Sequence, residues 1–274
     1  LTASGRVLDD RFKDDDILAL EQYLMDHSGL PDHGLSDHLL AAFAAEVHRI
    51  CYDETVSLRV SYNGVEWLME AWRSLAQVRI PDNDPRVVLP ACAVMGTGVH
   101  AVAFKAVTEG ARILMHMASS PLATVREVVA CGFQQMLVED WPHTVHELRR
   151  YAHIGDAQQH RAAVLAVAEP LLLAERARAL DALDLHHAIL AAYRRLSPAA
   201  RRGEHVQALR QALPGTIGVV LAAERRAGFA AAQTWLAWGD ADVTQIVRES
   251  VEQPPLAHYE EAAYLRQSFS NGRS

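Results

Sequence analysis

Apolar positions recur along the chain at the spacing of an α-helix, in segments separated by short turns that contain Pro, Gly or Asp. Amphipathic segments begin at Ile17 and at Ser36, and a third follows Asn63. The carboxylates of Asp14–Asp16 precede the first segment, where negative charge stabilises a helix N-terminus. The period-2 alternation that marks half-buried strands is nearly absent. The pattern therefore predicts an all-α protein.

The turns become regularly spaced in the last two thirds of the chain. Helices that follow a turn begin near Pro121, Asp156, Pro198 and Asp240, at separations of 35, 42 and 42 residues. This spacing is close to the period of about 40 residues at which helix pairs stack in some solenoid proteins. The expected first helices of the pairs are Val107–Ala118, Trp141–His153, Ala174–Leu196 with a break near Asp184, and Phe229–Trp238.

This periodicity predicts how the chain is organised. Residues 81–274 are expected to form one right-handed α-solenoid, and residues 1–80 an acidic N-terminal helical cap. Within the array, Pro90 and Gly96–Gly98 interrupt an apolar segment. Proline and glycine weaken helix interiors, so we expect short helices joined by a tight turn there rather than one long helix.

Charge and cysteine content narrow the classes of function. The net charge is −8, and residues 1–140 hold 11 basic against 20 acidic side chains, whereas residues 141–274 hold 15 against 14. This balance disfavours duplex DNA as a partner, because affinity for DNA comes mainly from neutralised phosphates. Cys51, Cys92 and Cys131 are odd in number and lie in apolar surroundings, which predicts free thiols. Without an N-terminal apolar leader or about 18 consecutive apolar residues, a cytoplasmic protein outside the membrane is expected.

The stretches Ser119–Gln134 and Ile154–Pro170 each predict a short turn that holds Pro or Asp, then an Arg, then a helix with an apolar face rich in Ala and Val. Four pieces carry a family resemblance: NDPRVVLPACAVMG (Asn83–Gly96), VREVVACGFQ (Val125–Gln134), HRAAVLAVAEPLLL (His160–Leu173) and DADVTQIVRESV (Asp240–Val251). Together they resemble a bacterial HEAT-repeat family that is distantly similar to the HEAT-like proteins of DNA-alkylation repair. The resemblance covers about residues 82–256 and implies an α-solenoid, with no activity assigned to most members. The repair glycosylases among solenoids surround a catalytic Asp with aromatic and basic residues, and no such set can be placed at matching positions here.

Arginines stand at or near the start of the second helices, at Arg126, Arg161 and Arg248. In such repeats this arginine joins a ladder of acidic residues between adjacent turns, here with Asp156 or Asp240. Alternatively, a row of guanidinium groups on a concave face would bind a small anion bidentately, which makes the three arginines candidates for ligand binding. The arginine pairs expected on solvated faces or at a docked partner are Arg201–Arg202 and Arg225–Arg226.

The 14 histidines supply candidates for acid–base chemistry. If the protein is an enzyme, His146 or His160 would act as general acid or base near Glu139 and Asp140, with an ordinary surface role as the alternative. His143 and His146 share one helical face, but neither His-Glu-x-x-His nor Cys-x-x-Cys occurs. The sequence therefore predicts no metal site and no cofactor.

Tryptophans mark the ends of the expected first helices. Trp141, Trp235 and Trp238 would seal the repeat core there, or would contact a flat ligand or the apolar anchor of a partner. Trp67 and Trp72 are five positions apart on one expected helix and cannot both face the same way. One of them is therefore expected to be exposed in the N-terminal cap, as part of an interface.

Three functions are compatible with these features. The first is a binding scaffold whose concave groove and N-terminal cap hold a protein partner or an anionic ligand, because solenoids offer long surfaces and few pockets. The second is an enzyme, or one subunit of a heteromeric enzyme with a neighbour-encoded partner, that acts on a small or carrier-bound anionic substrate in a specialised-metabolite pathway. The third is a glycosylase or damaged-DNA binder of the alkylation-repair type.

Overall fold

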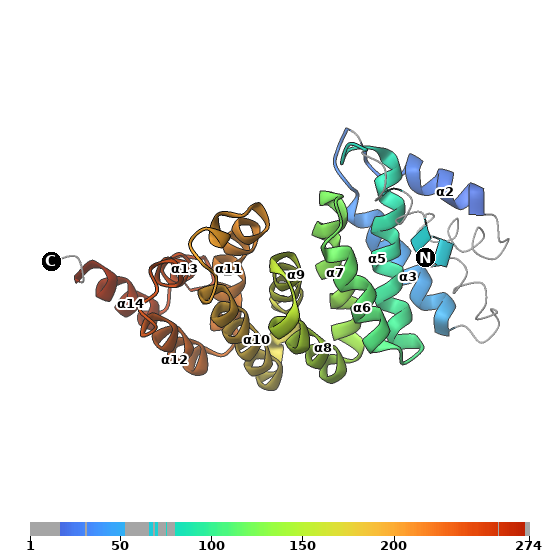
Figure 1. Cartoon of the computed structure of the whole chain (residues 1–274). Helices are drawn as coiled ribbons and strands as arrows, with labels where there is room; N and C mark the ends of the chain where they lie inside the picture. The colour runs from blue at the N-terminus through green and yellow to red at the C-terminus, as the bar shows by residue number, and fades with distance from the viewer. Residues whose placement is uncertain are drawn as a thin grey trace. The chain divides into compact units, whose positions relative to one another are not determined.

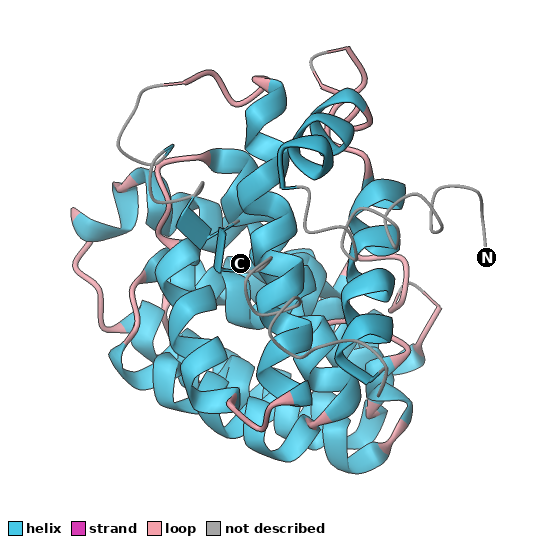
Figure 2. Cartoon of the chain, turned by 90° about the vertical axis from the view of Figure 1, so that its right-hand side faces the viewer, coloured by secondary structure: helices cyan, strands magenta, loops and turns pink. Residues whose placement is uncertain are grey.

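The computed structural model (Figure 1) describes residues 17–30, 32–52, 66–67, 69–70, 75, 80–256 and 258–271. Within these residues every regular element is a helix, and Figure 2 shows helices joined by loops without a strand. The prediction of an all-α protein is therefore confirmed. The features singled out in the sequence that lie outside the described residues are Asp14–Asp16, Asn63 and Trp72.

The chain forms two compact units. The first ends at Thr144 and the second begins at Val145, so the boundary falls inside helix α8 (Trp141–Ile154). Helix α3 (Asp37–Tyr52) comes from the part of the chain before residue 80, and α5 (Val88–Ala103) comes from the part after that residue. The two helices pack against each other within the first unit. The proposed division of the chain into residues 1–80 and 81–274 stays a prediction.

The first unit is built around α5, which packs against the helices α2, α3, α6 and α7. Almost every residue of α5 is buried, because its side chains are apolar or small on all faces. Among the described helices, the stretch Pro85–Ala103 is long and apolar enough to cross a membrane, but 83% of it is buried inside the protein, as in a core helix. The remaining elements of this unit are α2 (Ile17–Asp26), η1 (Pro85–Val87), α6 (Val107–Ala118) and α7 (Ala123–Glu139).

The continuity of α5 contradicts the prediction of short helices around Pro90 and Gly96–Gly98. Pro90 lies in the first turn, where the missing N–H would have no partner within the helix. Gly98 is required by packing, since a Cβ there would stand 2.2 Å from the carbonyl oxygen of Gly132 on α7. A Cβ on Gly132 would in turn stand 2.9 Å from the carbonyl oxygen of Val94. The glycines thus allow α5 and α7 to approach closely.

The second unit consists of helices that pack in an alternating order. Helix α9 packs against α11 and α11 against α13, while α10 packs against α12, as the ribbon of Figure 1 allows the reader to follow. The last helix, α14, packs against α13. The bounds are α9 (Ala157–Val167), η2 (Leu172–Ala174), α10 (Arg176–Arg194), η3 (Ala200–Arg202), α11 (Glu204–Ala223), α12 (Arg225–Leu236), α13 (Ala241–Val251) and α14 (Glu260–Asn271).

Two of the predicted repeat turns end in aspartates that cap helices. The Asp156 carboxylate accepts hydrogen bonds from the backbone N–H groups of Gln158 and Gln159 at 2.9 and 3.0 Å, and the Asp156 N–H donates to the Gln159 side chain at 3.1 Å. Asp240 accepts from the Val243 N–H at 3.0 Å. Both carboxylates satisfy backbone donors that a helix start leaves free, so the predicted starts of α9 and α13 are confirmed.

The predicted first helices agree with the structure in part. Helices α6 and α8 begin where expected, but α10 has no break near Asp184. That side chain is 78% exposed, and a solvated aspartate costs a helix interior little. Helix α12 begins four residues before the expected Phe229, because the Glu224 carboxylate accepts the Ala227 N–H at 2.7 Å and caps the helix earlier.

The glycine contact leads to a prediction about stability. We expect Gly132→Ala to lower the free energy of unfolding by about 1–3 kcal/mol, because the added methyl group must displace Val94 or the backbone of α5. Gly215→Ala in α11 is the matched control, since its new Cβ meets nothing within 4 Å and should stabilise the helix by about 0.5–1 kcal/mol. Urea unfolding followed by circular dichroism measures both, and equal stability of Gly132→Ala and the wild type would contradict the packing argument.

Candidate functional site

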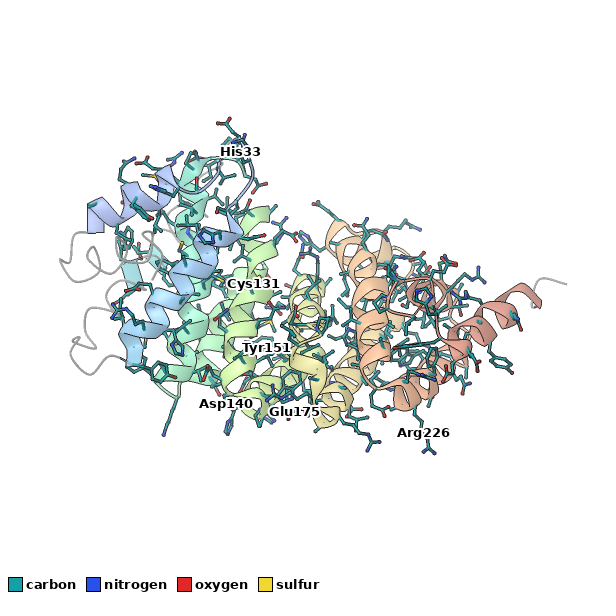
Figure 3. The ribbon with its side chains drawn as sticks, turned by 180° about the vertical axis from the view of Figure 1, so that it is seen from behind. His33, Cys131, Asp140, Tyr151, Glu175 and Arg226 are labelled. Carbon is teal, nitrogen blue, oxygen red and sulfur yellow. The ribbon has the colours of Figure 1, made fainter. Side chains whose placement is uncertain are left out.

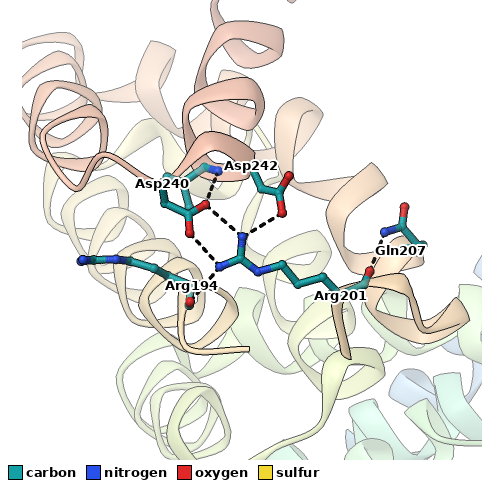
Figure 4. Close-up of polar contacts among 6 residues, drawn as sticks. Arg194, Arg201, Gln207, Asp240 and Asp242 are labelled. Carbon is teal, nitrogen blue, oxygen red and sulfur yellow. Dashed lines mark hydrogen bonds and ion pairs between the residues drawn. The ribbon is translucent and has the colours of Figure 1, made fainter. Parts of the chain in front are cut away.

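Arg201 binds two aspartates, Asp240 and Asp242 (Figure 4). Its Nη2 donates to Asp240 and its Nη1 to Asp242, both at 2.7 Å, and Nη2 also donates to the Arg194 carbonyl at 2.8 Å. The hydrogen bond to Asp240 raises the pKa of Arg201, and the same bond lowers the pKa of Asp240. The Arg201 side chain is only 13% exposed, so its expected place on a solvated face is wrong. It is covered because it joins the turn before α11 to the turn before α13.

The three arginines proposed for ligand binding lie in different surroundings. Arg126 on α7 donates from Nη1 to the carbonyls of Ser120 and Pro121 at 2.7 and 3.0 Å, so it holds the turn between α6 and α7 through carbonyl groups. Arg161 on α9 and Arg248 on α13 are half-buried in the second unit. Binding of an anion by the row of Arg126, Arg161 and Arg248 stays a prediction.

The four acid–base candidates divide between surface and interior. Asp140, labelled in Figure 3, lies 2.9 Å from His143 Nδ1, and Glu139 lies 3.8 Å from His48 Nε2. His146 is exposed on α8. The remaining candidate, His160, is almost fully buried in the second unit.

Buried histidines of the second unit are held neutral by their surroundings. His160 donates from Nε2 to the carbonyl of Tyr151 (labelled in Figure 3) at 3.2 Å, and burial lowers its pKa. His186 on α10 is fully buried, donates from Nδ1 to the Ala182 carbonyl at 2.8 Å, and has a pKa that burial lowers to about 4. A neutral imidazole that donates to a carbonyl packs in a core without an uncompensated charge.

The tryptophans at the ends of the expected first helices pack into the units. Trp141 and Trp235 are buried, and Trp238 is half-buried. Trp235 donates from Nε1 to His187 Nδ1 at 3.1 Å, and the Trp238 ring meets the same imidazole edge-on at 5.2 Å. Arg194 lies over the Trp238 ring at 5.4 Å. These contacts favour the core-sealing interpretation for Trp235 and Trp238.

The first unit contains a cavity that the sequence analysis missed. It lies where α5 and α6 pack together (Figure 1) and has a volume of about 470 Å³. Ala101 on α5 and Gly110 on α6 both line it. The two helices are in close contact at these residues, since a Cβ on Gly110 would stand 2.3 Å from the Ala101 Cβ. The described residues that line the cavity are Glu66, Met69, Thr97, His100, Ala101, Phe104, Ala106, Glu109, Gly110, Arg112 and Ile113.

Polar groups in the cavity wall are arranged around apolar side chains. The Thr97 hydroxyl lies 3.7 Å from the sulfur of Met69, and Arg112 Nε donates to Glu109 at 2.8 Å. The His100 ring stacks on Phe104 at a centroid distance of 4.9 Å, and Phe104 is 40% exposed. An apolar pocket with a few polar groups is the usual composition of a small-ligand site.

A signal for this cavity is present in the sequence. Thr97, His100, Ala101 and Phe104 are spaced i, i+3, i+4 and i+7, so they share one face of an otherwise apolar helix. Polar residues on such a face indicate a lined space rather than a packed contact.

Among the described residues, no group of three His, Cys, Asp or Glu side chains is placed to hold a metal ion.

A second hollow, of about 610 Å³, lies between α12 and α14 of the second unit. Its wall carries the ion pair between Arg225 and Glu261, at 2.7 Å, and the Arg225 guanidinium also lies 4.7 Å from the centre of the Tyr259 ring. These contacts tie the last helix to α12. The α5–α6 cavity, with its mostly apolar wall, is therefore the better candidate site.

Removal of the Arg201 guanidinium should destabilise the second unit. We expect Arg201→Met, which keeps an apolar stem near the Tyr193 ring 5.0 Å away, to lower the free energy of unfolding by about 2 kcal/mol, because two carboxylates lose their partner. The exposed neighbour Arg202 provides the control, and Arg202→Met should change stability by less than about 0.5 kcal/mol. Similar effects of the two substitutions in urea unfolding would argue against a stabilising role for the ion pairs of Arg201 with Asp240 and Asp242.

Acid should destabilise the protein through His186. The ordinary pKa of a histidine is near 6.5, so between pH 6.5 and 4 the unfolded state binds more protons than the folded state. Stability from this group is complete above pH 6.5 and is lost as the pH falls to about 4. We expect His186→Leu to reduce the loss of unfolding free energy between about pH 7.5 and pH 5 by roughly 2 kcal/mol.

Exposed His146 supplies the control for this titration, because His146→Leu removes an imidazole that solvent already surrounds. Its pH dependence should match that of the wild type. The comparison uses the slope of the unfolding free energy against pH. A loss of stability in His186→Leu that is the same at every pH therefore does not affect it. A slope in His186→Leu equal to that of the wild type would contradict the assignment.

Comparisons with known proteins leave the family open. No protein-family model matches the chain, and no match was found among the curated proteins or among the solved structures. The resemblance to HEAT-repeat proteins stays a prediction from the sequence.

Proposed function

We propose that this protein is a HEAT-like helical-repeat binding protein that holds a ligand in the α5–α6 cavity. Contacts that recur at the repeat spacing support the repeat architecture. Asp82 accepts from the Ala123 N–H, 41 residues away, and Arg201 and Arg210 bind Asp240 and Glu249 respectively, each 39 residues away. Contacts at such regular separations are expected where equivalent positions of successive repeats meet.

The order in which the helices pack supports the same architecture. In the first unit α5 packs against α7, and in the second unit α9 packs against α11, α11 against α13, and α10 against α12. Helices two places apart in the chain are neighbours in each unit, as in stacked helix pairs. This packing leaves each helix pair one face for the core and one for binding.

The observation that carries the binding function is the composition of the cavity wall. Five of its side chains, those of Met69, Ala101, Phe104, Ala106 and Ile113, are apolar, and its volume lies in the range of about 300–1,000 Å³ that small-ligand sites occupy. Among its polar groups, Arg112 pairs with Glu109, and the Thr97 hydroxyl contacts the Met69 sulfur.

Partial exposure of Phe104 supports entry from solvent. An aromatic side chain that is 40% exposed at a cavity presents apolar surface to whatever binds there. The ligand is therefore either a small molecule with an apolar body or the apolar anchor residue of a partner. Both would bury the same aromatic and aliphatic surface.

Filling the cavity tests this function. We expect the neutral dye Nile red to bind with a blue-shifted emission, and Ile113→Trp to weaken its binding by about tenfold or more, because the indole occupies the space. Val138→Trp is the matched control, since Val138 lies on the same unit, is 57% exposed and does not line the cavity. Equal dye binding by the wild type and Ile113→Trp, or no binding by the wild type, would reject the proposal.

A further inference from the structure

The charges of the described residues around the α5–α6 cavity do not cancel. Among these lining residues are two carboxylates, Glu66 and Glu109, and one guanidinium, that of Arg112. Arg112 donates to Glu109 through Nε at 2.8 Å, so these two charges neutralise each other. The exposed Glu66 has no ion pair or hydrogen bond within the described part of the chain. One negative charge is therefore left beside an apolar space.

An aromatic surface lies in the same wall. The His100 and Phe104 rings stack at 4.9 Å with an angle of 25° between their planes. The face of an aromatic ring attracts a cation through its quadrupole, and this attraction is strongest where water is excluded. A carboxylate and the Phe104 ring in one cavity favour a positively charged group over a negative one.

The charge of the surrounding chain acts in the same direction. Residues 1–140, which make up nearly all of the first unit, carry 20 acidic against 11 basic side chains. A net negative unit raises the local concentration of cations and lowers that of anions. The net charge of the described cavity wall and the net charge of the unit therefore have the same sign.

We propose that the α5–α6 cavity binds an amphipathic amine, with the apolar body against Phe104 and Ile113 and the ammonium group at Glu66. This inference rests on the proposed binding function and adds the charge and class of the ligand. It differs from the anionic ligand that the arginine pattern of the sequence predicts, because that pattern involves Arg126, Arg161 and Arg248, which do not line this cavity.

Three probes of nearly equal size test the charge preference. They are 2-phenylethylamine, 2-phenylethanol and 3-phenylpropionate, which are cationic, neutral and anionic at pH 7 and share one aromatic body. We expect the amine to bind about tenfold more tightly than the carboxylate, with the alcohol between them, by isothermal titration calorimetry at low salt. Glu66→Gln should weaken amine binding about three- to fivefold and leave alcohol binding unchanged.

Asp32→Asn is the matched control for net charge. Asp32 is exposed in the first unit and does not line the cavity, so the substitution removes the same charge at a distance. Amine affinity should be close to that of the wild type in this variant. An equal loss in Asp32→Asn and Glu66→Gln would overturn the placement of the ammonium group at Glu66.

The possible failures are distinguishable. If all three probes bind with equal affinity and Ile113→Trp abolishes that binding, the cavity is a ligand site and only the amine preference is wrong. If 3-phenylpropionate binds most tightly, the ligand is an anion and the present inference is overturned. If neither the probes nor Nile red bind, both the amine inference and the proposed function are rejected.

Discussion

Small residues on α5 are the constraint on which the first unit depends. Gly98 meets the carbonyl of Gly132 on α7, and Ala101 touches Gly110 on α6, in both cases without room for a larger side chain. The distance between two packed helices is set by the side chains at their contact, so these residues let α5 be covered by several helices at once. The same contact between Ala101 and Gly110 forms part of the cavity wall, which links the core of the unit to its candidate site.

The second unit depends more on charged side chains, each of which takes part in two interactions. Asp240 accepts the Val243 N–H as a helix cap and also binds the Arg201 guanidinium. One carboxylate therefore serves both the start of α13 and the link to the preceding turn. A half-buried guanidinium is stable in this position only because two carboxylates and the Arg194 carbonyl compensate its desolvation.

Local chemistry was predictable from the sequence, and tertiary compensation was not. The caps at Asp156 and Asp240 depend on residues within three positions, and both were located from the turn pattern. The continuity of α5 was not predicted, because Gly98 is needed for the contact with Gly132, 34 residues away in the chain, and does not end the helix. Likewise Arg201 and Arg202 are equivalent in sequence, and only the packing of α13 determines which of them is covered.

The difference between what the sequence displays and what tertiary contacts leave available also applies to the candidate site. A count of arginines in the sequence suggests an anionic ligand, but an arginine attracts an anion only to the extent that its charge is not already balanced. Arg112 beside Glu109 is balanced within one helical turn, and Arg201 is balanced by two carboxylates from the next turn. At the cavity it is the carboxylate of Glu66 that has no balancing charge within the described residues. The sign of a ligand follows from the charge that remains after pairing, and at this cavity that charge is negative.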